Sequence, residues 1–356
     1  MTAIQINDLS KAFGDFIALQ ELSLSVSEGE FLTLLGPSGC GKTTLLKMIS
    51  GFIEPTSGSI EIDGTDVTSV PPEHRNTAMC FQSYALFPHL SVRENLEFGL
   101  KEQRVARNER KSRVQEVADQ LELGQQLSKL PNELSGGQQQ RVALGRALVM
   151  RPKVILFDEP LSNLDAKLRD NVRLEIRRIQ KSFGLTAIYV THDQSEALAM
   201  SDRILVMNAG RAEQLGTPEE IYVTPKTSFV ADFIGSANVM SGKVVGEVSN
   251  NIWAVDTDLG QFHVASDDGP AGPDVNICWR PERGTILSGD EEPGQYQNLI
   301  LSKVNVRSYQ GGHTDLFFEE KGVSFRTIGR DLLVDIGDEC RICIDPKDVV
   351  FLEVSS

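Results

Sequence analysis

Long apolar segments and an excess of basic charge are both missing from this chain of 356 residues. Its longest apolar stretches, such as residues 31–35, fall far short of the roughly 18 residues that a membrane-spanning helix requires. Lys and Arg number 35 against 50 Asp and Glu, a net charge of −15, so the chain offers no general basic field to attract nucleic acid or anionic lipid. We therefore expect a protein that neither spans a membrane nor takes nucleic acid as its main partner.

Cysteine is scarce as well. Five cysteines are an odd number in a long chain, which fits a reducing compartment better than a disulfide framework. The N-terminus alternates Ile4 and Ile6 with polar residues instead of carrying the apolar core of a signal peptide, so export is not expected. Cys340 and Cys343 form a CxxC pair, but residues three apart on a strand face opposite sides and no second pair completes a zinc site. We interpret them as buried strand cysteines.

Short apolar runs alternate with helical patterns from residue 1 to about residue 235. Apolar residues at steps of three and four over 168–183 predict a helix between such runs. This alternation predicts an α/β fold, a mostly parallel sheet covered by helices. The runs that predict buried strands, rich in β-branched and aromatic residues, are 31–35, 154–157, 186–190 and 203–207.

Two further regions depart from this rhythm. A charged helical stretch over 104–123 interrupts the strands and predicts an inserted helical subdomain, about 84–150. After Gly235, short alternating runs separated by Gly, Asp and Pro predict a small antiparallel β-domain or barrel. Two domains are thus expected, 1–235 and 236–356. The strands expected in the second are 251–256, 261–265, 299–309, 315–319, 323–328 and 341–344.

The segment GPSGCGKT at 36–43 matches the pattern GxxxxGK[ST]. It follows the 31–35 run and leads into a helix with apolar residues at 45, 46, 48 and 49. Its glycines allow successive backbone N–H groups to point at phosphate, and the helix N-terminus adds the positive end of its dipole. The Lys42 ammonium would bridge β- and γ-phosphates, and the Thr43 hydroxyl would ligate Mg²⁺.

Two carboxylates, Asp158 and Glu159, follow the 154–157 run. Acid side chains beside a buried strand are costly unless cations meet them, and the ligand crevice of a parallel sheet lies at the carboxyl ends of its strands. Together with the phosphate loop, these residues predict that Asp158 is the Mg²⁺ partner through water. Glu159 is the candidate to take a proton from an attacking water.

A third motif, LSGGQQQR, occupies 134–141. It predicts another anion site, because Ser135 can cap the following helix and two glycines leave its N–H groups uncovered. Taken in order with the phosphate loop, Gln82, the carboxylates, SNLD at 162–165 and His192, the set closely resembles the ATP-binding-cassette (ABC) ATPase family. That resemblance implies a P-loop cassette with a parallel-sheet core and a helical subdomain, ATPase activity, and ATP and Mg²⁺ as cofactors.

The resemblance also implies a role for each matching residue. Glu159 corresponds to the general base and His192 to the γ-phosphate contact, and Lys42 and Gln82 complete the expected catalytic set. Phe13 stands where the family stacks adenine on an aromatic ring, with Phe16 as the alternative. The expected Mg²⁺ shell, direct or water-mediated, is Thr43, Gln82 and Asp158. The expected phosphate cradle is Gly36, Pro37, Ser38, Gly39, Cys40, Gly41, Lys42, Thr43 and Thr44.

Family members work as pairs of cassettes that face head to tail. Ser135, Gly137 and Asp165 would therefore contact a nucleotide held by the partner's phosphate loop. Since this chain carries one set of motifs, the resemblance implies a second copy of itself or a paralogue. The 84–150 insert resembles the surface that receives a membrane subunit. Its apolar cluster either contacts that subunit or belongs to the core: Tyr84, Leu86, Phe87 and Pro88.

Three later segments, GTPEEIY at 216–222, FVADFIG at 229–235 and RPE at 280–282, resemble bacterial importer ATPases with a C-terminal TOBE-like regulatory domain. The resemblance implies two transmembrane permease subunits, an extracytoplasmic solute-binding protein acting indirectly, and a peripheral location on the cytoplasmic face of the inner membrane. Sugar-importing members of this group usually have Gly-Ser-Pro where this chain has GSAN at 235–238, so the resemblance favours polyamine (spermidine or putrescine) or ferric iron as cargo, with phosphonate, sulfate or sugar as the alternative. Arg280 is either a regulatory contact or the start of a turn.

A soluble ABC ATPase that acts on nucleic acid is the competing class. Such proteins insert long coiled-coil arms between the phosphate loop and the signature, and here Lys42 and Ser135 are separated by a short gap. The net charge of −15 also disfavours a nucleic-acid partner.

Overall fold

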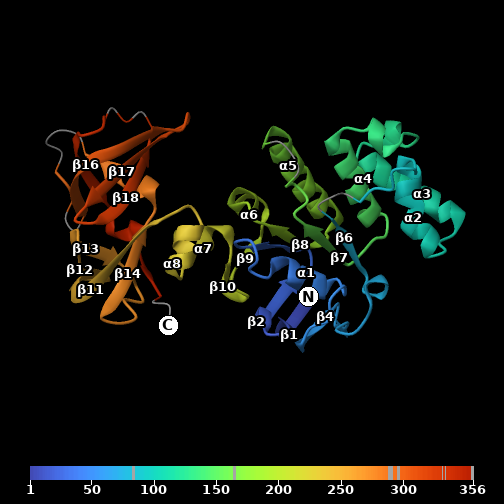
Figure 1. The fold of residues 1–356 in the computed structure, drawn as a ribbon, viewed down its shortest axis with the longest axis horizontal. Coiled ribbons are helices and arrows are strands. Elements are labelled where there is room, and N and C mark those ends of the chain that lie inside the picture. The colour runs from blue at the N-terminus through green and yellow to red at the C-terminus, as the bar shows by residue number, and fades with distance from the viewer. Residues whose placement is uncertain are drawn as a thin grey trace. The chain divides into compact units, whose positions relative to one another are not determined.

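The computed structural model describes residues 1–81, 85–162, 166–287, 292–294, 297–330, 332 and 334–353. It divides into two compact units, Met1–Pro218 and Glu219–Ser356, drawn as a ribbon in Figure 1. Along the chain, this division lies before the boundary expected near residue 235. Helices α7 (Pro218–Val223) and α8 (Ser228–Phe233) are joined to Arg280, which follows β14 (Asp274–Trp279) in the second unit. Within the described part of the chain, every helix is too short or too polar to cross a bilayer.

A mostly parallel sheet forms the centre of the first unit, and this confirms the predicted fold class. Every residue of β3 and β8 is buried, as expected of strands that are covered on both faces. The strand at one edge, β10, is antiparallel to its neighbour, and the other pairs are parallel. The order is β10 (Arg211–Gly216), β9 (Arg203–Asn208), β3 (Phe31–Leu35), β8 (Thr186–Thr191), β7 (Val154–Asp158) and β6 (Thr77–Cys80).

An antiparallel sheet that the sequence analysis did not predict covers one side of this centre. Its order is β2 (Phe16–Ser27), β1 (Thr2–Phe13), β4 (Ser57–Ile62) and β5 (Thr65–Asp66). Ile4 and Ile6 of β1 share a buried cluster with Leu32 and Leu34 of β3 and with α1 (Lys42–Ile49). This packing fixes the helix that follows the phosphate loop against the sheet.

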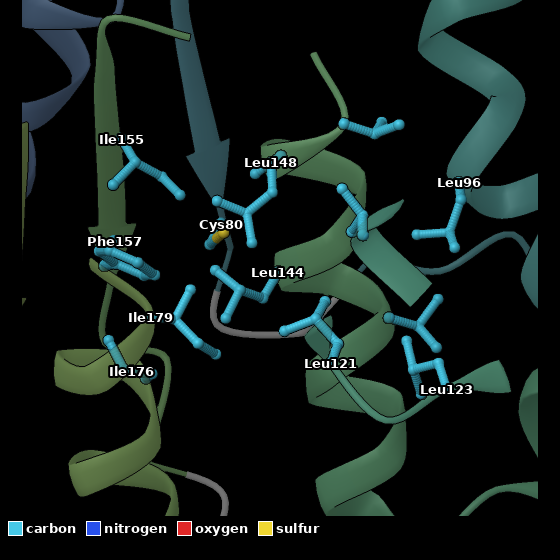
Figure 2. Close-up of a cluster of buried hydrophobic side chains, with 14 of the residues drawn as sticks. Cys80, Leu96, Leu121, Leu123, Leu144, Leu148, Ile155, Phe157, Ile176 and Ile179 are labelled. Atoms are coloured by element: carbon cyan, nitrogen blue, oxygen red, sulfur yellow. The ribbon is translucent and has the colours of Figure 1, made fainter. Parts of the chain in front are cut away.

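Helices cover the other side. The helical region comprises α2 (Val92–Glu102), α3 (Arg107–Gln120) and α4 (Gly136–Leu148), followed after β7 by α5 (Ala166–Phe183). Figure 2 shows their common core, in which Leu144 of α4 and Ile176 of α5 lie near Phe157 of β7 and Cys80 of β6. The helical subdomain therefore shares one hydrophobic core with the sheet, and any movement of α4 relative to β7 has to repack this core.

The second unit is an antiparallel β-domain, as predicted. The first sheet has the order β13 (Gly260–Ala265), β12 (Ile252–Thr257), β11 (Asn238–Ser249), β14 (Asp274–Trp279), β20 (Val349–Leu352). The second has the order β15 (Thr285–Ile286), β19 (Glu339–Ile344), β16 (Asn298–Tyr309), β17 (Thr314–Glu320), β18 (Val323–Gly329). Phe262, Trp279, Phe318 and Ile342 from the two sheets form one core. Cys340 and Cys343 are buried on β19, which confirms their interpretation as strand cysteines.

Arg280 does precede a 3₁₀ turn (Pro281–Arg283), but its main role within the second unit is structural. The residue is only 6% exposed. Its Nε donates to the Tyr222 carbonyl at 2.8 Å, and Nη1 donates to the carbonyls of Ala231 at 2.9 Å and of Ile234. The guanidinium also lies 4.2 Å from the centroid of the Tyr222 ring. One buried side chain thus joins α7 and α8 to the end of β14.

We expect Arg280→Ala to destabilise the second unit by about 2–4 kcal/mol, because it leaves three backbone carbonyls without their charged donor. Arg283→Ala is the matched control, since Arg283 is 52% exposed and pairs with Asp348 at 3.4 Å. The loss of this exposed ion pair should lower the free energy of unfolding by about 0.5 kcal/mol or less. Urea unfolding followed by tryptophan fluorescence measures both, because the two tryptophans, Trp253 and Trp279, lie in this unit. Equal effects of the two substitutions would contradict this assignment.

Candidate nucleotide site

Three neighbouring parallel strands end at one edge of the central sheet, and each is followed by predicted site residues. The phosphate loop follows β3, Asp158 and Glu159 end β7, and His192 follows β8. The register pairs Leu35 with Thr191 and Asp158 with Val190. Because the carboxyl ends of parallel strands meet at the same edge, three segments far apart in the sequence lie together there.

The phosphate loop has no room for side chains at two of its glycines. A Cβ on Gly36 would lie 2.2 Å from the Met207 carbonyl oxygen. Gly41 has a φ of +103°, and a Cβ there would lie 2.6 Å from the Ala18 carbonyl oxygen. Gly41 also provides no side-chain cap for α1, whose first turn contains no acidic residue. The positive end of this helix is thus left for an external anion.

The side chain of Lys42 is buried inside the curl of this loop. Its Nζ donates to the carbonyls of Gly36 at 2.6 Å and Pro37 at 2.9 Å. Cys40 is also buried, with its Sγ 3.7 Å from Nζ. In contrast, Ser38 and Gly39 are exposed at the tip of the loop, and Thr43 and Thr44 are half-buried. The ammonium therefore lies beneath a tip that a ligand can reach.

Thr43 of α1 and Asp158 of β7 are in contact at this edge. The Thr43 hydroxyl donates to Asp158 Oδ1 at 3.4 Å. Burial, and then the neighbouring Glu159 charge, raise the pKa of Asp158, while the charge of Lys47 and the Thr43 hydrogen bond oppose this rise. A partly buried carboxylate of this kind gains from a cation, and hydroxyl and carboxylate oxygens are the ligands that Mg²⁺ prefers. The pair fits a Mg²⁺ site, and Gln82, the third expected ligand, lies outside the described residues.

Glu159 and His192 form a second pair beside the first. His192 Nδ1 lies 3.2 Å from Glu159 Oε2. Glu159 has a φ of +46°, in the left-handed region that non-glycine residues rarely adopt. Its N–H donates to the Val190 carbonyl at 3.1 Å, and its own carbonyl accepts from the Ser162 hydroxyl at 3.0 Å. The strained backbone aims the carboxylate toward the end of β8, where His192 stands.

The LSGGQQQR motif at 134–141 forms the start of α4, as predicted. Ser135 Oγ accepts from the N–H of Gln138 at 3.4 Å, and Gln138 Oε1 accepts from the N–H of Ser135 at 3.1 Å. This capping box confirms the helix cap expected at Ser135. Ser135 is exposed and Gly137 is half-buried, so the turn can receive a partner. Asp165, expected to act with them, lies outside the described residues.

The two candidate adenine platforms are cross-strand neighbours at the turn between β1 and β2. Phe13 and Phe16 pair in register, and both rings are exposed. The Lys11 ammonium lies 5.0 Å from the Phe13 ring centroid and donates to the Glu54 carbonyl at 2.7 Å. The role of Phe13 stays a prediction, and Lys11, which covers its ring, was missed.

The apolar cluster of the helical subdomain lies partly against the core. Leu86 packs on the core cluster of the first unit. The Phe87 ring lies 4.4 Å from that of Phe98, centroid to centroid. Tyr84 lies outside the described residues. Contact with a membrane subunit therefore stays a prediction.

Lys47 is a further residue that the sequence analysis missed. Its positive charge lowers the pKa of Asp158 and so partly offsets the effect of burial. The available signal was its position four residues after Thr43, which places both on one face of a helix.

The known proteins that are similar to this chain include ATP-binding proteins of import systems. Residues 19–162 match the family model described as ABC transporter. A spermidine/putrescine import ATP-binding protein of Pseudomonas aeruginosa is 48% identical over 346 residues, which cover 94% of each chain. Its counterpart in Thermobifida fusca is 49% identical, covering 88% of this chain and 82% of the relative.

A further relative and a solved structure are also similar to this chain. An sn-glycerol-3-phosphate import ATP-binding protein of Rhizobium etli is 55% identical over 327 residues, covering 88% of this chain and 89% of the relative. The solved structure of cbiO1 from Clostridium perfringens, described as part of the ABC transporter complex cbiONQ, is similar with a TM-score of 0.58 and 29% identity. It covers 62% of this chain and 90% of its own.

We expect Asp158→Asn to raise the thermal midpoint of the ligand-free chain by about 2–4 °C, because it removes a partly buried carboxylate beside Glu159 and keeps an oxygen for Thr43. The gain should disappear as the pH falls below the usual carboxyl range, where Asp158 is neutral in folded and unfolded chains alike. Asp66→Asn is the control. Hydrogen bonds from Thr68 lower the pKa of Asp66, so its loss should not stabilise the chain. A lower midpoint for Asp158→Asn at neutral pH, measured by calorimetry, would contradict the expectation.

Proposed function

Since the chain belongs to the ABC transporter family, as the ATP-binding and ATP-hydrolysing subunit of an importer, we propose which residues perform hydrolysis and which solute is imported. The observation that carries the catalytic proposal is the juxtaposition of two pairs at adjacent strand ends, Thr43 with Asp158 and Glu159 with His192. One pair is suited to a cation and the other to proton transfer. The phosphate loop, which follows β3, would supply the anion site beside them.

The phosphates of ATP would bind over the tip of the loop, where the start of α1 is uncapped. The Lys42 ammonium would exchange the carbonyls of Gly36 and Pro37 for β- and γ-phosphate oxygens. Because Gly36, Gly39 and Gly41 have no side chains, the backbone of the loop could approach the phosphates closely. Phe13 would stack on adenine, with Phe16 as the alternative.

Glu159 would accept the proton of the water that attacks the γ-phosphate. His192, in contact with Glu159, would hold that water and the γ-phosphate in line. Thr43, Asp158 and Gln82 would hold the Mg²⁺ ion that binds with ATP. The ion would offset the negative charge on the phosphates. Burial of Asp158 prepares this site, because a partly buried carboxylate is stabilised when a cation arrives.

We also propose the assembly in which this chemistry is used. A second copy, head to tail, would bring Ser135, Gly137 and Asp165 to the γ-phosphate, and the exposed turn at Ser135 supports this arrangement. Two permease subunits would dock on the helical subdomain at the cytoplasmic face of the inner membrane, fed by an extracytoplasmic solute-binding protein. The β-domain would be a TOBE-like regulatory domain.

Polyamine is the cargo we propose. Support comes from the spermidine/putrescine importer subunits, one of which matches over 94% of both chains, and from GSAN at 235–238. The sn-glycerol-3-phosphate importer subunit, which is 55% identical, supports a second candidate, a sugar phosphate. Ferric iron stays a prediction of the sequence alone.

Glu159→Gln should lower the ATPase turnover by about 10²–10⁴-fold and leave ATP affinity close to that of the wild type, because only the proton acceptor is lost. Turnover of the full chain with its membrane subunits and equilibrium ATP binding are the measurements. Glu109→Gln, which removes an exposed carboxylate paired with Arg113 in α3, should change neither. Wild-type turnover in Glu159→Gln would remove Glu159 from the mechanism.

Cells that lack this chain should lose uptake of labelled spermidine or putrescine and keep uptake of sn-glycerol-3-phosphate. The wild-type chain should restore the lost uptake, and Glu159→Gln should not, because uptake depends on ATP turnover. Loss of sn-glycerol-3-phosphate or ferric iron uptake alone, with polyamine uptake intact, would replace the cargo proposed here.

A further inference from the structure

His192 is held at the site by its backbone and not by the packing of its own side chain, which is 58% exposed. The residues on either side of it are anchored inward. Thr191 is buried as the last residue of β8, and Asp193 caps α6 (Gln194–Met200) through hydrogen bonds from the N–H groups of Ser195 and Glu196. The position of His192 therefore depends on what fixes these two neighbours.

A buried carboxylate behind the site fixes both of them. Glu196 is 4% exposed, and its Oε2 accepts from the Thr191 hydroxyl at 2.7 Å and from the Tyr189 hydroxyl at 2.8 Å. The Thr191 oxygen in turn accepts from the N–H of Asp193 at 2.9 Å. Both hydroxyls are satisfied donors, and burial beside Glu196 raises the pKa of Tyr189 well above its usual value, so the phenol stays neutral.

This arrangement differs from an ordinary helix cap in one respect. In a capping box, the carboxylate at the third helical position accepts directly from the N–H of the capping residue. Here Glu196 holds that third position, but the Thr191 hydroxyl lies between it and the N–H of Asp193. One carboxylate thereby fixes the residue before His192 and the residue after it.

The network also reaches α5. Arg169 Nη1 lies 3.3 Å from Asp193 Oδ2, and its Nε lies 3.9 Å from Glu196 Oε1. A carboxylate this deeply buried is costly unless hydrogen bonds and a cation compensate it, and both are present. Nothing in the hydrolysis chemistry above uses these side chains directly.

We propose that Thr191 and Glu196 are positioning residues for hydrolysis, which act through His192 by fixing the backbone on both sides of it. This inference rests on the proposed role of His192. Misplacement of a group that orients the attacking water lowers the rate of hydrolysis far more than the affinity for the nucleotide. A network with a purely structural role would instead lower the stability of the fold. Any effect of its loss on the rate would then be the same with and without His192.

Thr191→Val is the central test, because it keeps the shape of the side chain and removes the hydroxyl that links Glu196 to Asp193. In the full chain with its membrane subunits, we expect about tenfold lower kcat and a KM for ATP within about twofold of the wild type. Thr191→Ser, which restores a hydroxyl, should recover most of the rate. In a His192→Ala background, Thr191→Val should cause no further loss.

Thr33→Val is the matched control on the neighbouring strand. Thr33 is a fully buried residue of β3, opposite Tyr189, and its hydroxyl accepts from Ser201 at 2.6 Å. Its replacement should leave kcat unchanged, since it removes a buried hydroxyl without touching Glu196. Glu196→Gln, which keeps the size of the side chain and removes its charge, tests the same link if Thr191→Val does not fold.

Unchanged kcat in Thr191→Val, or the same fold loss with and without His192, would overturn the proposal. Equal losses in Thr191→Val and Thr33→Val would also overturn it, because a general effect of buried hydroxyls would then suffice. Unchanged turnover in His192→Ala alone is a different failure. It would refute the proposed role of His192 and, with it, the inference built on that role.

Discussion

The register of three parallel strands is the constraint on which the rest of this structure depends. β3, β8 and β7 are neighbours, and their ends at Leu35, Thr191 and Asp158 lie at one edge of the sheet. Hydrophobic burial of all three strands sets that register, so the core determines where the polar chemistry lies. A slip of one residue in β8 would turn His192 away from Glu159.

The buried charges of this protein differ in how fully nearby groups compensate them. Arg75 and Arg280 are buried cations that donate hydrogen bonds to backbone carbonyls, and they hold loops and helices in place. Asp158 is only partly compensated, which leaves it ready for a cation. Asp158 is thus a carboxylate that burial disfavours, whereas Arg75 and Arg280 are cations with hydrogen-bond acceptors around them.

Much of this could be predicted from the sequence because the motifs are local. The phosphate loop lies between a buried strand and a helix, and the Ser135 cap depends on residues three positions apart. The sheet of β1, β2, β4 and β5 was missed because the register of β1 is irregular against both of its neighbours, and because its pairing with β4 joins segments that are distant in the sequence. Distance does not explain why Glu196 and Lys11 were missed, because both lie close in the sequence to the residues that they contact. Their importance lies in side-chain contacts, of Glu196 with Thr191 and of Lys11 with Phe13, and no motif in the sequence marks these contacts.

A crystal structure of the full chain with Mg²⁺ and a non-hydrolysable ATP analogue tests the central claim most directly. The account predicts that the Lys42 ammonium leaves the Gly36 and Pro37 carbonyls for the β- and γ-phosphates, that Thr43 and Asp158 surround the cation, and that Glu159 and His192 face the γ-phosphate. A nucleotide bound elsewhere, or a γ-phosphate out of reach of Glu159, would contradict it.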